Sequence, residues 1–230
     1  MASISDTEAV VSTASGVLCL LNDGEGSQRL SLAKHVDFGI ASLAVDLHRE
    51  AVWVGGGGGQ VEYFTFQDLR TSVVSAAPSS GAVGKPMSSR RTKKESSVTS
   101  MGLLPSHLIT VDAKRAIRLY PIDNLYDVSQ QNRTGTLLPA HGDAVLGIRP
   151  LRTPNSLDAE FFTWSSGGAI NFWDAQGKHH GSRKAKLDQL SSGEDDVWNE
   201  LRIVCAAEDM SFFVSGDKLG VLRCAPPFLL

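Results

Sequence analysis

The sequence predicts an all-β fold built from repeats. Three observations predict it: a hairpin-like segment recurs along the 230 residues, its copies superimpose without gaps, and no long stretch has helical periodicity. Each copy has an apolar run, a few small or polar residues and a second apolar run, which is typical of an antiparallel β-hairpin. The five copies begin at Thr7, Ala51, His107, Glu160 and Ser211.

Two apolar positions align the five segments. The eleventh position is β-branched and the fourteenth is mostly large and apolar. The eleventh position holds Val17, Val61, Ile117, Ile170 and Val221, and the fourteenth holds Leu20, Phe64, Tyr120, Trp173 and Cys224. A further apolar run precedes four of the segments, and the connections have room for a fourth strand. We therefore expect four-stranded antiparallel units, repeated at a spacing somewhat longer than the roughly 40 to 45 residues of a propeller blade.

The surplus length falls in polar connections. Residues 72–97 are rich in Ser and basic residues and predict a disordered insertion, and residues 177–196 predict a polar loop. The rest of 1–230 is expected to form a single domain. Only six residues precede the first hairpin, so we expect its unit to lack a leading strand, and MASIS could supply an outer strand.

The fourth segment carries a family resemblance. HGDAVLGIRPL, residues 141–151, followed by FFTWSSGGAINFWD, residues 161–174, resembles a WD40 repeat. The resemblance covers roughly residues 7–224, although the other copies match it weakly. It implies a divergent WD40-like β-propeller of about five recognisable repeats.

The resemblance also implies a structural hydrogen-bond network. Carried over residue by residue, its members are His141, Thr163 and Trp173, with Asp174 completing the terminal Trp-Asp pair. Gly167 stands where the family has an Asp in the turn, so the expected network is incomplete even in the best copy. WD40 propellers most often have seven blades, so a small closed ring, an open arc, a fragment and a chain completed by a partner all remain compatible with five repeats.

The sequence offers no site for catalysis or for a cofactor. The glycine run in WVGGGGGQVEYF, residues 53–64, is followed by a strand-like segment and lacks the Lys-Ser/Thr and helix of a phosphate-binding loop, so we interpret it as a hairpin turn. No nucleophile elbow or metal-ligand spacing occurs. We therefore expect a non-enzyme with no cofactor, no metal and no small-molecule substrate.

Composition restricts the setting of the protein. The formal charge of −3 disfavours a polyanion-binding protein as a whole, and no apolar run reaches the ~20 residues of a membrane span. Three widely spaced cysteines without CxxC pairs favour reduced thiols. We expect a cytoplasmic or nuclear protein that does not contact a membrane.

One charged cluster is the candidate contact or localisation loop. It comprises Lys85, Arg90, Arg91, Lys93 and Lys94. Such a cluster is typical of a solvated loop, of a nuclear-localisation signal, or of an electrostatic contact to nucleic acid or an acidic partner.

The leading functional hypothesis is a non-catalytic scaffold that mediates protein–protein interaction within a larger complex. It rests on the family resemblance, since propellers hold loops that bind partners. The alternatives are a nuclear chromatin- or nucleic-acid-associated factor that uses the basic loop, and a small propeller enzyme, which the lack of acidic or His residues at equivalent inner-strand positions disfavours.

Overall fold

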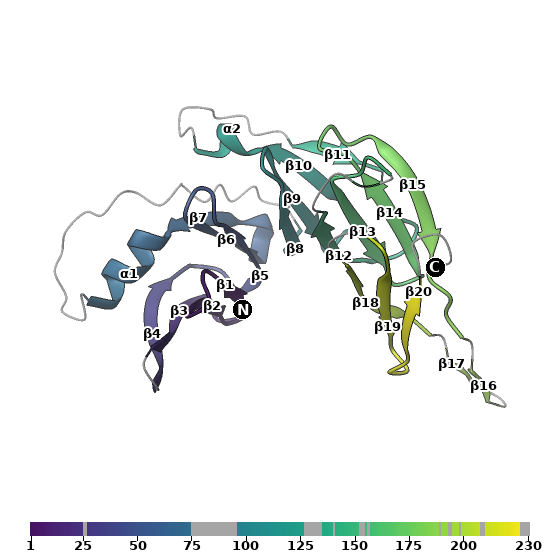
Figure 1. Cartoon of the computed structure of the whole chain (residues 1–230), viewed down its shortest axis with the longest axis horizontal. Helices are drawn as coiled ribbons and strands as arrows, with labels where there is room; N and C mark the ends of the chain where they lie inside the picture. The colour runs from purple at the N-terminus through teal and green to yellow at the C-terminus, as the bar shows by residue number, and fades with distance from the viewer. Residues whose placement is uncertain are drawn as a thin grey trace. The chain divides into compact units, whose positions relative to one another are not determined.

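The structure is a computed structural model of the whole chain (Figure 1). It describes residues 1–24, 27–74, 96–126, 135–139, 141–151, 155, 157–188, 190–192, 195–197, 199–207 and 210–225. The chain forms two compact units, Met1–Leu103 and Leu104–Leu230. Each is built from antiparallel sheets, so the all-β prediction is confirmed.

The first unit contains two blades. Blade 1 has the strand order β1-β2-β3-β4, and blade 2 has the order β5-β6-β7. The strands are β1 (Ala2–Ser3), β2 (Glu8–Ser12), β3 (Val17–Gly24), β4 (Ser27–His35), β5 (Ile40–Asp46), β6 (Ala51–Gly56) and β7 (Val61–Thr65). Strand β8 (Val98–Leu103) ends the unit and packs against β5 and β6.

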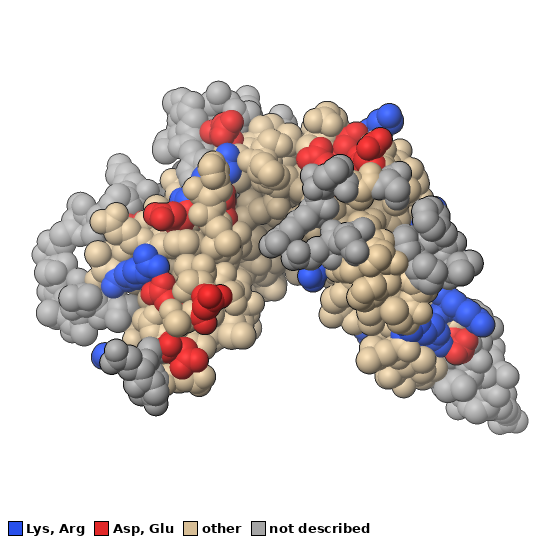
Figure 2. Space-filling model, viewed as in Figure 1, with Lys and Arg blue, Asp and Glu red and all other residues tan. Residues whose placement is uncertain are grey.

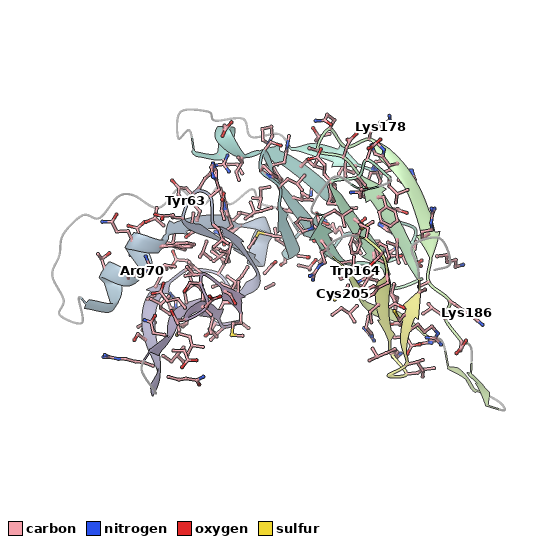
Figure 3. All side chains as sticks on the ribbon, viewed as in Figure 1. Tyr63, Arg70, Trp164, Lys178, Lys186 and Cys205 are labelled. Carbon is pink, nitrogen blue, oxygen red and sulfur yellow. The ribbon has the colours of Figure 1, made fainter. Side chains whose placement is uncertain are left out.

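A short helix takes the place of a fourth strand in blade 2. Helix α1 (Phe66–Val74) follows β7 and packs against β4 and β7, with Phe66 and Leu69 buried in the core. A reciprocal cap explains where it begins: the Asp68 N–H donates to Thr65 Oγ1 at 3.0 Å, and the Thr65 N–H donates to Asp68 Oδ2 at 3.2 Å. Arg70, labelled in Figure 3, forms an ion pair with Glu8 of β2.

The second unit contains three blades and a separate hairpin. Blade 3 includes the neighbouring strands β9, β10 and β11, blade 4 has the order β12-β13-β14-β15, and blade 5 has the order β18-β19-β20. The strands are β9 (His107–Asp112), β10 (Ile117–Pro121), β11 (Thr136–Leu138), β12 (Val145–Pro150), β13 (Phe161–Ser165), β14 (Ala169–Trp173), β15 (His179–Lys184), β18 (Leu201–Ala206), β19 (Phe213–Asp217) and β20 (Leu222–Ala225). Helix α2 (Ile122–Tyr126) follows β10, and β16 (Leu190–Ser192) pairs with β17 (Asp195–Val197).

Aromatic side chains fill the core between blades 4 and 5. Phe162 and Phe172 of blade 4 lie 5.6 Å and 5.9 Å, between ring centroids, from Phe213 of blade 5. Trp164 packs in the same cluster, close to Gly147 of β12. A Cβ on Gly147 would lie 2.2 Å from the Trp164 ring, so only glycine leaves room for the indole.

All five predicted hairpins are present, but their alignment needs a correction. Each hairpin turn contains a residue with a positive φ. This residue lies three positions after the first residue of the turn. The first turn residues are Thr13, Gly56, Asp112, Ser165 and Asp217, and the positive-φ residues are Gly16, Gly59, Arg115, Gly168 and Gly220. The gapless superposition is therefore one residue out in the first and fifth hairpins, where Leu18 and Leu222 rather than Val17 and Val221 are equivalent to Ile117.

Two further expectations differ from the structure. Strand β1 lies beside β2, so the N-terminal residues supply a leading strand rather than an outer one. The segment 177–196 contains β15, the outer strand of blade 4, so it is not loop throughout. Its polar composition suits an edge strand, since one edge and much of both faces lie outside the core. Of the insertion expected at 72–97, residues 72–74 close α1, and 75–95 lie outside the described residues.

The glycine run divides between a strand and a turn. Gly55 and Gly56 are buried in β6, and Gly57–Gly59 form a single 3-10 turn. A Cβ on Gly56 would lie 1.9 Å from the carbonyl oxygen of Gly39, so the backbones approach too closely for any other residue.

Candidate interaction surface

Aspartate side chains hold two of the hairpin turns in the second unit. Asp112 Oδ1 accepts hydrogen bonds from the Lys114 and Ala116 N–H groups at 2.9 and 3.0 Å, while Oδ2 accepts from Arg118 at 2.9 Å. One carboxylate therefore fixes both the turn and the strand that leaves it.

Asp217 repeats this arrangement in blade 5. Its Oδ1 accepts from the N–H groups of Leu219 at 3.1 Å and Val221 at 2.9 Å. Its Oδ2 accepts from Arg223 at 2.7 Å and from the Asn199 amide at 2.9 Å. Burial alone would raise the pKa of Asp217, but these hydrogen bonds from Asn199, Arg223 and Val221 lower it to about 2.

Asp174, a predicted member of the network, instead fixes a turn in the same way, and no hydrogen bond joins its side chain to the other three predicted residues. Its Oδ1 accepts from the Gln176 and Lys178 N–H groups at 3.0 and 2.8 Å, and Oδ2 lies 2.9 Å from His180 Nε2. Burial opposes ionisation of Asp174, yet the bonds from His180, Lys178 and Gln176 lower its pKa. It therefore secures the β14–β15 turn.

The structure brings together the other three residues of the predicted network. His141 Nε2 lies 2.8 Å from Thr163 Oγ1, and Trp173 Nε1 donates to the same oxygen at 3.0 Å. Asn171 Nδ2 lies 3.3 Å from His141 Nε2. His141 Nδ1 is buried and has no hydrogen-bond partner within the described part of the chain.

Gly167 lies beside the side chain of Asp143. A Cβ on Gly167 would lie 2.0 Å from Asp143 Oδ2, so the exposed Asp143 side chain would have to move to admit a longer residue. Burial lowers the pKa of His141 to about 4; the negative charge of Asp143 opposes this shift and His179 adds to it. His141 is thus neutral near pH 7 and belongs to the structural framework.

Hydrogen bonds brace the turns of blades 3 to 5. Within blade 4 the Ser166 N–H donates to the Ala144 carbonyl at 2.9 Å, and within blade 5 the Lys218 N–H donates to the Glu200 carbonyl at 2.8 Å. The Leu201 N–H donates to the Ser166 carbonyl at 2.9 Å and joins blades 4 and 5, while the Arg115 side chain joins blade 3 to the Gly142 carbonyl. The turns of blades 3 to 5 and the residues just before β12 and β18 are called the turn surface below. Its charged side chains are the exposed Lys114, Arg115, Asp143 and Lys218 and the partly exposed Glu200.

Arg115 is the unusual member of the turn surface. It has a φ of 71°, at the position where the other four hairpins have glycine. Its guanidinium donates to the Gly142 carbonyl at 2.6 Å, which ties blade 3 to the loop before blade 4. An exposed non-glycine residue in this left-handed conformation costs stability, and such strain clusters at functional sites.

The charged surface is mixed. On the face shown in Figure 2, side chains of both signs are scattered among uncharged ones. The predicted basic loop, Lys85, Arg90, Arg91, Lys93 and Lys94, lies outside the described residues. Lys178 and Lys186 flank β15 (Figure 3), and Lys184 is exposed on that strand.

The described residues carry neither a metal cluster nor a membrane helix. Within them, no group of three or more His, Cys, Asp or Glu side chains could hold a metal ion. No helix in the same part of the chain is long and apolar enough to cross a bilayer.

Sequence reasoning missed the two Asp–Arg pairs of the turns. A signal was present, since Asp112 precedes Arg118 and Asp217 precedes Arg223 by the same six positions across a hairpin turn. The one-residue error in the fifth hairpin concealed the repetition.

Comparison with known proteins identifies the fold. No protein-family model matches the sequence, and no curated protein matches it. The structure resembles the WD40 β-propeller domain of Doa1, with a TM-score of 0.62 and 15% identity over 98% of this chain and 64% of that one. It also resembles Sqt1 of Chaetomium thermophilum, with a TM-score of 0.66 and 14% identity over 98% of this chain and 57% of that one. The chain thus spans less than two thirds of the length of either structure.

Proposed function

We propose that this chain, whose blades have the WD40 β-propeller fold, is a non-catalytic scaffold that binds protein partners within a larger complex. WD40 propellers in general serve protein–protein interaction, so the fold supports this general role. The partner-binding site proposed is the turn surface of the second unit.

Arg115 is the observation that carries the proposal. Its exposed side chain stands at the one hairpin turn of the five where glycine does not relieve the left-handed conformation. Arginine is enriched where interfaces concentrate their binding energy, since one side chain offers five donors and a flat apolar face.

The bracing of the surface supports the same role. Asp112 and Asp217 fix their turns through backbone and side-chain hydrogen bonds, so the exposed charges are held before a partner arrives. A preorganised surface loses less conformational entropy on binding. Lys114, Asp143 and Glu200 offer both signs of charge, which suits a polar protein surface rather than a polyanion.

The cytoplasm or the nucleus is the compartment that we propose. Cys19, Cys205 and Cys224 are all free, as is usual in reducing compartments.

An Arg115→Gly variant tests the function. Glycine accepts the observed φ, so the variant should fold with a stability within about 1 kcal/mol of wild type. Affinity purification of wild type from cells followed by mass spectrometry identifies the partners. Binding of the purified partner to Arg115→Gly is then expected to fall at least about tenfold, which corresponds to 1.4 kcal/mol.

Lys178→Gly is the matched control. Lys178 is exposed in the turn between β14 and β15, whereas the Ser165–Gly168 turn of the turn surface lies at the other end of β14. Partner binding that survives in Arg115→Gly, or that falls equally in Lys178→Gly, would contradict the assignment of the turn surface. Recovery of no specific protein partner would contradict the scaffold function itself.

A further inference from the structure

Blade 5 has one apolar face that no described residue covers. Residues directly opposite in an antiparallel sheet share a face. Ile203 pairs with Gly216, which pairs with Leu222, and the neighbouring row is Cys205, Val214 and Cys224. These six residues are the trailing face of blade 5; Figure 3 labels Cys205. Ile203 is 51% exposed and Leu222 is 73% exposed.

Blade 1 also has an uncovered apolar face. In the hairpin alignment it lies on the other side of the sheet from the uncovered face of blade 5. Val11 pairs with Cys19 and then Leu32, while Ala9 pairs with Leu21 and then Leu30. These six residues are the leading face of blade 1. Leu30 is 59% exposed and Leu32 is 63% exposed, although both lie on a sheet whose other face is in the core.

The stacks inside each unit show what such faces bind. In the first unit, Val10, Leu18 and Leu20 of blade 1 pack in one core with Val52 and Val54 of blade 2. In the corrected hairpin alignment, these blade 1 residues occupy positions equivalent to the trailing face of blade 5. The blade 2 residues occupy positions equivalent to the leading face of blade 1.

The second unit repeats this rule twice. Ile109 and Ile117 of blade 3 pack with Phe161 and Trp173 of blade 4. Phe162 and Phe172, on the trailing face of blade 4, pack with Phe213 on the leading face of blade 5. Each stack therefore joins the trailing face of one blade to the leading face of the next.

We propose that the trailing face of blade 5 in one molecule packs against the leading face of blade 1 in a second copy of this chain. The contact continues the blade stacking that already exists within each unit. Neither face has a charged residue among its six positions, so burial leaves no ion unpaired. Since the two faces differ, the contact is heterologous: each molecule carries both faces and contributes a different one to each of its contacts.

This self-association is independent of the turn surface. It uses sheet faces rather than hairpin turns, so Arg115→Gly should associate with itself as wild type does. Failure of the proposed function and failure of this inference are thus separate results.

Two variants, each altered on only one of the two faces, test the proposal. Leu222→Lys places a charge on the trailing face, and Leu32→Lys places one on the leading face, in both cases at side chains already more than half exposed. Analytical ultracentrifugation of wild type should give a mass that rises with protein concentration. Each variant alone should remain a monomer over the same range, and Leu222→Gln should weaken association less than Leu222→Lys.

Mixing the two variants gives the decisive result. Leu222→Lys retains an intact leading face and Leu32→Lys retains an intact trailing face, so an equimolar mixture should form a two-molecule species and nothing larger. Leu47→Lys is the control, because Leu47 is 63% exposed but lies in the turn between β5 and β6. It should associate as wild type does.

Three outcomes would overturn the proposal. Wild type could be a monomer at every concentration. Either Lys variant could still associate alone while keeping a native circular dichroism spectrum, which would indicate contact between identical faces. The mixture could contain monomers only.

Discussion

The imidazole of His141 makes the stability of blade 4 depend on pH. Its folded pKa of about 4 is below the ordinary value near 6.5, because burial disfavours the charged form. The unfolded chain therefore binds a proton first as the pH falls. The contribution of His141 to the free energy of unfolding is fully present above pH 6.5. It falls by up to about 3 kcal/mol as the pH is lowered from 6.5 to 4.

Urea denaturation between pH 7.5 and 4.5 measures this loss. A His141→Gln variant keeps a polar side chain but does not titrate, so its free energy of unfolding should fall less over the same range. Parallel curves for the variant and wild type would show that His141 does not account for the pH dependence.

Removal of the Asp217 carboxylate should strongly lower the free energy of unfolding. Its side chain is 1% exposed and accepts hydrogen bonds from Asn199 and Arg223 as well as from the turn. Asp217→Ala leaves Arg223 without this partner and frees the turn, so we expect a loss of about 3 to 5 kcal/mol in chemical denaturation.

Glu200→Ala is the comparison for Asp217→Ala. Glu200 pairs with Arg202 at 3.0 Å, but both side chains are substantially exposed. Its removal should cost less than about 1 kcal/mol. Equal losses in the two variants would mean that burial does not set the strength of these pairs.

The sequence predicted only some of the polar side chains that form the hydrogen-bond network of blade 4 and fix the hairpin turns. His141, Thr163 and Trp173 stand in a WD40-like motif, so the family resemblance implied their relation. The role of Asp112 and Asp217 depends on which backbone N–H groups the turn presents, and that follows from a positive φ three residues later. Arg115 hid this signal, since arginine rarely adopts that conformation.

Among the elements, β12 predicts a steric test. Gly147→Ala would place a Cβ 2.2 Å from the Trp164 ring, which is fixed in the blade 4 to blade 5 core. We expect a loss of about 1 to 3 kcal/mol in denaturation. Gly142→Ala is the matched control, because nothing lies within 4 Å of its added Cβ. Its stability should stay within about 0.5 kcal/mol of wild type.

The strands were more predictable than their register. Val, Ile and Phe runs on each side of a short polar segment predicted all five hairpins. Val17-Leu18 and Val221-Leu222 each offer two adjacent aliphatic residues, so the pattern alone fits either alignment. The choice matters because a shift of one residue exchanges the two faces of a strand.

The short helix and the outer strand escaped prediction for different reasons. Helix α1 has nine residues, too few for its periodicity to stand out, although Thr65 and Asp68 carry a capping signal. Strand β15 is polar throughout, since it is an edge, and its pattern resembles a loop.

For the whole molecule, self-association predicts protection of a thiol. Cys224 is exposed on the trailing face of blade 5. Alkylation of Cys224, followed by peptide mass spectrometry, should slow as protein concentration rises, while Leu222→Lys should react at one rate throughout. A rate independent of concentration in wild type would argue against burial of this face in an assembly.

The fold of the whole chain was predicted where repetition supplied the evidence. Five similar hairpins predicted blades, and the likeness to Doa1 and Sqt1 confirms a WD40 propeller fold. The turn surface, which we propose as the partner-binding site, was not predictable, because it combines residues from three blades that no single repeat contains.

In the turns that an aspartate side chain fixes, the backbone conformation does not depend on the identity of every turn residue. In the Asp112 turn, the carboxylate and the backbone N–H groups of Lys114 and Ala116 define the geometry, while the side chains of Ala113 and Lys114 are exposed. Ala113 and Lys114 can therefore vary without disturbing the framework. A library randomised at these two positions would display many short epitopes on one rigid support, so the chain offers a template for engineered binding proteins.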